Sequence, residues 1–262
     1  MGWLLADSWT VAKRHLLHIR SMPEKLSGVT IQPIVFVFMF AYIFGSAIAV
    51  PGGDYRQFLL PGVFVQSMAT ASASIMAGIV SDMASGVMDR FRSLPMARAA
   101  VLIGHTGANL VESGLGIVAM AVCGLIVGWR PELGLAPTLA AFGLLLLFGF
   151  AMSWVGVFAG LFLKSSEGAQ GLGFVLIMPL TFVANTFVPT GGMPAILRAI
   201  ANWNPTSAVV TACRQLFGGA VPAAPAWPQV HPVLASLLWF AALVAAFLPL
   251  SVWRFRRAMT AR

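Results

Sequence analysis

The charged segment Gly86-Val-Met-Asp-Arg-Phe-Arg-Ser-Leu-Pro-Met-Ala-Arg98 lies between two apolar stretches, residues 58–80 and 99–128, and this arrangement decides the fold. Each stretch is long enough to cross a hydrocarbon core of about 30 Å, which takes about 20 residues. A short charged connection between two such stretches predicts that the chain turns back at a membrane surface. The sequence therefore predicts a protein that crosses the bilayer repeatedly, with this segment exposed on one side.

The composition indicates the same class for the whole chain. Of the 262 residues, 59% are hydrophobic and 9% are charged, and the mean hydropathy is +0.88. Soluble domains carry about 25% charged residues, so this set does not supply a water-exposed surface. Six apolar stretches and their connections use up the chain, which leaves no room for a separate soluble domain. The predicted spans are residues 29–50, 58–80, 99–128, 135–163, 168–188 and 232–253.

Lysine and arginine residues divide unevenly between the two sides of this predicted bundle. With both termini inside, twelve of them fall on the inner side and four on the outer side, as the positive-inside rule requires. The net charge of +8 is therefore explained by this asymmetry and by contact with anionic lipid headgroups. It does not indicate nucleic-acid binding, since no basic block is interleaved with aromatic residues. We predict an all-α membrane protein of six transmembrane helices, with both termini in the cytoplasm.

The two ends of the chain both carry positive charge. Residues 1–25 have apolar side chains at helical spacing on one side and polar ones on the other, which predicts an amphipathic interface helix that Pro23 ends. This helix is either a membrane anchor or a platform for a cytoplasmic partner, and residues 254–262 form a basic cytoplasmic tail. The residues expected at the membrane surface are Trp9, Lys13, Arg14 and Arg20.

The segment between the second and third spans combines charge with apolar side chains. It fits a short amphipathic helix that inserts an apolar side chain into a groove of a partner protein, with Pro95 ending the helix. An ordinary positive loop on the cytoplasmic side is the alternative. The residues expected to contact the partner are Asp89, Arg90, Phe91, Arg92, Leu94 and Pro95.

Three polar residues share one face of the third predicted span. His105, Asn109 and Glu112 are spaced by four and three residues, as neighbours on one side of a helix are. A carboxylate within a span costs about 2.5–3.5 kcal/mol on insertion scales, so Glu112 is expected to face protein or water. Three roles are open to this face: hydrogen bonding between helices, coupling of span movements or contact with substrate, and a proton relay.

Aromatic residues in the first and fifth predicted spans are candidates for lining a hydrophobic route, with a few polar residues beside them. Phenylalanine in a membrane helix more often faces lipid or packs against protein, which is the alternative. The candidates for the route are Phe36, Phe40, Phe44, Gln66, Phe182 and Asn185.

The stretch 189–219, between the fifth and sixth spans, is too long for a turn and too broken for a span. Pro194 and Pro205 each open a predicted short helix, and Asn204 caps the second one, which contains Arg214. Each helix is below spanning length. We expect both to lie on the outer leaflet or to dip into it, with their polar backbone packed on protein.

Several motifs are absent from the sequence. There is no Gly-x-x-x-x-Gly-Lys-Ser/Thr phosphate loop, so the chain does not bind and hydrolyse ATP in that manner. The absence of a Gly-x-Ser-x-Gly elbow and of a His-Glu-x-x-His helix argues against an intramembrane hydrolase. Cys123 and Cys213 have no metal-ligand spacing, and two free thiols are favoured over a disulfide. No catalytic residue, metal or bound cofactor is predicted for this chain.

The order of these features resembles the ABC-2 type permeases, and most closely their daunorubicin-resistance branch. The resemblance rests on the segment Arg90-Phe-Arg-Ser-Leu-Pro-Met-Ala-Arg98 and on Asn204-Pro205, Arg214 and Gly218-Gly219 that follow it. It covers essentially the whole chain as a single transmembrane domain.

The resemblance implies partners and a mechanism. In such permeases two six-span subunits, expected here to be a homodimer, form the pathway, and two copies of a cytoplasmic ABC ATPase bind beneath them. ATP and Mg would be bound by the ATPase. Residues 83–96 would be the coupling helix, the N-terminal helix would be the interface helix, and the broken helices would cap the outer exit, with Arg214 nearby. Spans one, two and five would line the route of a lipophilic drug-like, polyketide or lipid substrate, exported across the plasma membrane by alternating access.

Two other classes of function remain open from the sequence. One is a secondary carrier or channel, which ATP-independent flux from the purified chain in liposomes would favour. The other is a non-transporting membrane protein, either an assembly scaffold or an intramembrane enzyme. A neighbouring ATPase reading frame with a phosphate loop would favour the exporter over both.

Overall fold

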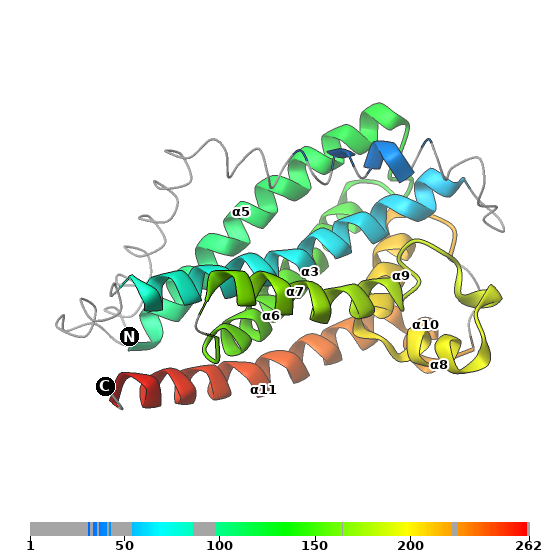
Figure 1. The fold of residues 1–262 in the computed structure, drawn as a ribbon. Coiled ribbons are helices and arrows are strands. Elements are labelled where there is room, and N and C mark those ends of the chain that lie inside the picture. The colour runs from blue at the N-terminus through cyan, green and yellow to red at the C-terminus, as the bar shows by residue number, and fades with distance from the viewer. Residues whose placement is uncertain are drawn as a thin grey trace.

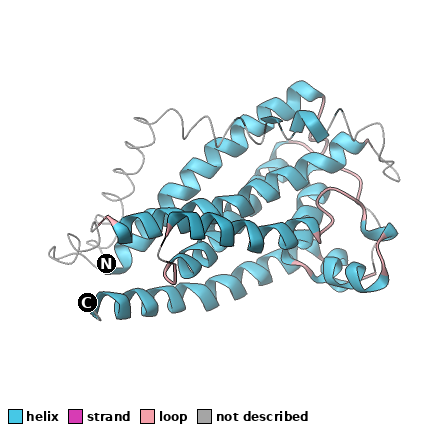
Figure 2. Cartoon of the chain, viewed as in Figure 1, coloured by secondary structure: helices cyan, strands magenta, loops and turns pink. Residues whose placement is uncertain are grey.

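The computed structural model of the protein describes most of the chain from Asp54 onwards. Among the residues it describes, all regular structure is helical (Figure 2). The predicted N-terminal helix, most of the first predicted span and the segment 86–97 lie outside the described residues. The described residues are 31, 34–35, 37–40, 42, 54–85, 98–163, 165–221 and 225–260.

Within this described part, four helices are long and apolar enough to cross a membrane. They correspond to the second, third, fourth and sixth predicted spans, and each begins and ends close to its predicted limits or extends beyond them. The four helices are α3 (Tyr55–Ala84), α5 (Arg98–Val127), α6 (Leu135–Gly160) and α11 (Pro232–Thr260).

The fifth predicted span, residues 168–188, corresponds to a shorter helix, α7 (Ser166–Phe182). Its 17 residues give a length of about 26 Å, at 1.5 Å per residue. The predicted end at residue 188 was wrong by six residues, because the chain leaves the helix after Phe182. The N–H of Val183 donates to the carbonyl of Pro179, and the residues that follow turn toward α9.

Two short helices follow where the sequence predicts them, α8 (Ala195–Trp203) and α9 (Pro205–Phe217). Asn204 caps α9 by accepting a hydrogen bond from the N–H of Thr206 at 2.9 Å. Gly218 ends α9 in the left-handed conformation, with φ of 83°, which favours glycine. Two shorter elements were not predicted, the 3-10 turn η2 (Thr190–Gly192) and α10 (Trp227–Val230).

Helix α3 is central to the bundle and packs against α5, α6, α7 and α9 (Figure 1). Glycines allow its neighbours to approach closely. A Cβ atom added to Gly156 of α6 would lie 2.3 Å from the carbonyl oxygen of Ser72, and one added to Gly173 of α7 would lie 2.6 Å from the Cβ of Ala73. Since side chains do not tolerate such distances, glycine is required where α6 and α7 cross α3.

The helices define two ends of the bundle (Figure 1). Helices α8, α9 and α10 gather at one end, which we call the α9 end. The C-terminal ends of α3 and α11 and the start of α5 lie at the opposite end, which we call the Ser85 end. Arg198 and Arg214 therefore lie at the α9 end, while Arg254 and Arg257 lie at the Ser85 end, in agreement with their predicted separation.

Candidate functional site

Arg214 of α9 is completely buried at the α9 end and links three parts of the chain. Its Nε donates to the carbonyl of Phe58 in α3 at 2.9 Å. Its Nη2 donates to the carbonyls of Asn185 at 2.8 Å and Thr186 at 3.0 Å, in the segment that follows α7. The guanidinium also lies over the ring of Phe58, 3.4 Å from its centroid. This one side chain therefore joins α9, α3 and the end of α7, although the sequence alone gave it only a place on the outer side.

The positive charge of Arg214 is balanced by dipoles and by an aromatic ring. Its hydrogen-bond acceptors are backbone carbonyls, and the Phe58 ring supplies a cation–π contact. Burial lowers the pKa of the Arg214 guanidinium to about 9, so the group stays cationic at neutral pH. Its Nη1 has no hydrogen-bond partner within the described residues. The carbonyl contacts therefore hold a charge that would otherwise be costly to bury.

Asn185 extends this buried network toward α9 and α10. Its backbone N–H donates to Ser207 Oγ at 3.1 Å, and its Nδ2 donates to Thr211 Oγ1 at 2.7 Å. Thr211 Oγ1 in turn donates to Gln229 Oε1 at 2.6 Å, and Gln229 Nε2 donates to the carbonyl of Asn202 at 3.0 Å. Asn185, which the sequence offers as a route residue, is buried in this network in the described structure.

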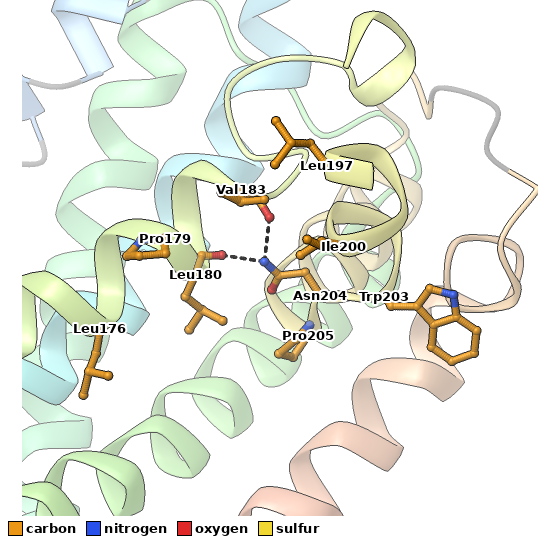
Figure 3. Close-up of a pocket in the computed structure, with 9 residues that line it drawn as sticks. All are labelled: Leu176, Pro179, Leu180, Val183, Leu197, Ile200, Trp203, Asn204 and Pro205. Atoms are coloured by element: carbon orange, nitrogen blue, oxygen red, sulfur yellow. Dashed lines mark hydrogen bonds between the residues drawn. The ribbon is translucent and has the colours of Figure 1, made fainter. Parts of the chain in front are cut away.

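Asn204 connects the end of α7 to the start of α9 (Figure 3). Its Nδ2 donates to the carbonyls of Leu180 and Val183, each at 2.8 Å, while its Oδ1 caps α9. Carbonyls at a helix C-terminus have no partner within the helix, so this amide replaces the missing donors of α7. We call the whole set the Arg214 joint, which comprises Asn185, Asn204, Thr211, Arg214 and Gln229.

An apolar groove lies beside the Arg214 joint, between α7 and α8 (Figure 3). One side consists of Leu176, Pro179, Leu180 and Val183, and the other includes Leu197 and Ile200 of α8. Leu176, Leu197 and Ile200 are all exposed in the isolated chain. A groove of this composition suits a lipophilic chain or ring and offers little to a polar ligand.

Two of the predicted route residues meet through a third aromatic ring. Phe40 of the first predicted span stacks on Phe187 with ring centroids 4.9 Å apart, and Phe182 lies 5.3 Å from the same ring. Gln66 is partly exposed on α3. Phe36 and Phe44 lie outside the described residues. The structure therefore brings Phe40 and Phe182 to the same ring, that of Phe187.

The predicted polar face of α5 contacts two different helices. His105 Nε2 lies 2.8 Å from Asp82 Oδ2 of α3, and Asn109 Nδ2 donates to Ser153 Oγ of α6 at 3.0 Å. Glu112 is partly exposed. Asp82 is not among the predicted site residues because the second predicted span stops at residue 80, whereas α3 continues to Ala84. The signal was a carboxylate shortly before the connection between two consecutive spans and a histidine shortly after it.

Two sets of predicted residues cannot be located on the fold. The interface-helix residues Trp9, Lys13, Arg14 and Arg20, and the partner-contacting residues from Asp89 to Pro95, lie outside the described residues. Cys123 and Cys213 are both free thiols.

The fold and these contacts define an all-helical membrane protein whose apolar helices are joined by buried polar groups. Residues 7–217 match the model of the ABC-2 type transporter family. The chain belongs to that family.

Individual relatives are named as permeases. The chain is 32% identical to the daunorubicin resistance ABC transporter permease protein DrrB1 of Streptomyces coeruleorubidus, over 93% of this chain and 83% of the relative. It is 23% identical to the probable doxorubicin resistance ABC transporter permease protein DrrC of Mycobacterium tuberculosis, over 89% and 82% of the two chains. It is 22% identical to the putative transport permease ycf38 of Cyanophora paradoxa, over 82% and 75%. These similarities confirm the resemblance to daunorubicin-resistance permeases.

Proposed function

We propose that this chain is the permease subunit of an ATP-driven exporter of lipophilic, drug-like molecules. The observation that carries the proposal is the 32% identity, over 93% of the chain, to a permease named for daunorubicin resistance. Daunorubicin is a flat amphiphile, and the apolar groove between α7 and α8 and the cluster of Phe40, Phe182 and Phe187 would suit a ligand of that chemistry.

The energy for export would come from a separate subunit. The chain has no phosphate loop, so two copies of a cytoplasmic ABC ATPase would bind Mg and ATP, and residues 83–96 would dock on them. A second copy of this chain would complete the pathway. In this arrangement six spans cross the plasma membrane, both termini and the Ser85 end face the cytoplasm, and the α9 end faces outward. Closure of the ATPases on ATP would move the helices between inward-open and outward-open states.

The direct test is transport by the purified complex. The chain is co-expressed with a candidate ABC ATPase subunit, reconstituted in liposomes, and supplied with daunorubicin and ATP. We expect ATP-dependent movement of daunorubicin away from the side that carries the ATPase, and none when the phosphate-loop lysine of the ATPase is replaced. Equal flux from the permease alone without ATP would contradict the proposal and support a carrier or channel.

The docking segment has its own test. Arg92→Glu and Phe91→Asp are expected to abolish co-purification of the ATPase while membrane insertion is retained. Normal co-purification with both variants would contradict the assignment of this segment to ATPase contact.

A further inference from the structure

A buried polar contact joins the two helices on either side of residues 86–97. His105 Nε2 of α5 and Asp82 Oδ2 of α3 are 2.8 Å apart, and the two side chains are only 5% and 18% exposed. Asp82 lies in the last turn of α3 and His105 in the second turn of α5. The contact therefore fixes the two helices to each other close to where each meets this segment.

Helix α3 extends from this contact to the Arg214 joint as one helix, with Pro61 inside it near the Arg214 joint. It has 30 residues, a length of about 45 Å at 1.5 Å per residue. At its far end the Phe58 carbonyl accepts from Arg214, and Gly62 lies against the backbone of Thr186, whose carbonyl also accepts from Arg214. A displacement of the Ser85 end of α3 is therefore delivered to the α9 end by a continuous helix.

We infer that Asp82 and His105 are a positioning pair that holds α3 and α5 together when residues 86–97 move, so that α3 carries the movement toward the Arg214 joint. The inference rests on the proposed function, because it requires a partner that moves this segment. Apolar side chains fix the position of one helix along another only weakly. A buried hydrogen-bonded pair forms at only one relative position of the two helices. Both helices are joined to residues 86–97 by the chain itself. With the pair in place α3 and α5 move as one unit; without it the two helices can shift relative to each other.

The neighbouring contact on α5 provides a comparison. Asn109, one turn further along, bonds to Ser153 of α6 and not to α3. Loss of that bond would loosen α5 from α6 but leave the connection between residues 86–97 and α3 intact. The two contacts are similarly buried and have similar distances. Variants at the two contacts can therefore be compared to distinguish a general loosening of the bundle from a loss of transmission along α3.

The test uses the full complex with its ATPase, reconstituted in liposomes, with daunorubicin as the transported probe. Three variants weaken the pair to different degrees: Asp82→Asn, His105→Leu and His105→Gln, the last of which keeps a side-chain donor. Ser153→Ala is the matched control for an interhelical bond. Glu167→Gln is the control for removal of an exposed carboxylate near the same end of the bundle. For each variant we measure ATPase co-purification, ATP hydrolysis, and daunorubicin moved per ATP hydrolysed.

For Asp82→Asn and His105→Leu we expect normal co-purification and continued ATP hydrolysis, with daunorubicin moved per ATP reduced by about tenfold or more, the usual size of a coupling between sites. His105→Gln should retain more coupling than His105→Leu, and both controls should match the wild type. Unchanged daunorubicin per ATP in Asp82→Asn and His105→Leu would overturn the inference while leaving the proposed function intact. If the wild-type complex moves no daunorubicin with ATP, the proposed function fails, and the inference fails with it.

Discussion

The two ends of α3 are held in different ways. At the α9 end, Arg214 donates three hydrogen bonds to backbone carbonyls and is completely buried. At the Ser85 end, the contact joins two side chains, and Asp82 keeps 18% of its surface exposed. Backbone carbonyls are fixed by the fold, whereas two side chains separate by rotation about their own bonds. We therefore expect the α9 end to determine stability and the Ser85 end to determine how movement is transmitted.

The largest effect on stability is expected from Arg214→Leu. Hydrogen bonds that involve a charged group contribute about 1.5–3 kcal/mol each, so loss of three should lower the free energy of unfolding by about 4.5 kcal/mol or more. Arg214→Lys keeps the charge but cannot reproduce the planar set of donors, and should be intermediate. Reversible unfolding in mixed detergent micelles measures both. A stable Arg214→Leu protein would show that the Arg214 joint does not hold α9 against α3.

A smaller effect is expected where the chain after α7 touches α3. A Cβ atom at Gly62 would lie 2.2 Å from the carbonyl oxygen of Thr186, so Gly62→Ala should displace a carbonyl that Arg214 binds. Overpacking of this kind costs about 1–3 kcal/mol. Gly78 lies in the same helix with nothing within 4 Å of an added Cβ, so Gly78→Ala is the matched control. If both alanine variants melt at the same temperature, the close approach at Gly62 is not required.

The next effect concerns the link between α7 and α9. Asn204→Ala removes a helix cap as well as the donor to two carbonyls of α7, and should cost about 1–2 kcal/mol. Asn204→Asp keeps the acceptor that caps α9 but has no donor for α7. Hydrogen exchange followed by mass spectrometry separates the two roles. We expect the Asp variant to expose the end of α7 while α9 stays protected, and exposure of α9 would contradict this division.

The smallest effect on stability is expected from Ser153→Ala, which removes the bond from Asn109. Hydrogen bonds between membrane helices contribute about 0.6 kcal/mol on average and about 1.7 kcal/mol at most. The change in the free energy of unfolding should therefore lie well below that of Arg214→Leu in the same detergent. A loss as large as that of Arg214→Leu would show that the polar face of α5 carries the fold.

Local properties of the sequence predicted most of the helices. Apolar length identified α3, α5, α6 and α11, and the pair Asn204-Pro205 identified the start of α9, because a cap and an N-terminal proline act within one turn. The end of α7 depends on Asn204, more than 20 residues further along, so apolar length extended the span too far. Signals that act within one helical turn do not indicate contacts between residues so far apart in the sequence.

The site was predicted less completely, for the same reason. Asn204, Pro205 and Arg214 were identified together, but the acceptors of Arg214 lie in α3 and after α7, and nothing in the spacing of the sequence indicates them. A polar side chain in an apolar stretch, such as Asn185, suggests a ligand when its protein partners are not known, and its partners lie in α9 and α10. Asp82 lies beyond the second predicted span because a charged residue marks the edge of an apolar stretch. Helix α3 nevertheless continues past Asp82 to Ala84.

The most direct measurement compares the two ends of α3 in one preparation of the reconstituted complex. Melting temperature and daunorubicin moved per ATP hydrolysed are measured for the wild type, Asp82→Asn and Arg214→Lys. We predict that Asp82→Asn lowers daunorubicin per ATP with little change in melting temperature, whereas Arg214→Lys, which disturbs the Arg214 joint itself, lowers the melting temperature. The reverse pattern, or equal losses of both quantities in the two variants, would contradict the account.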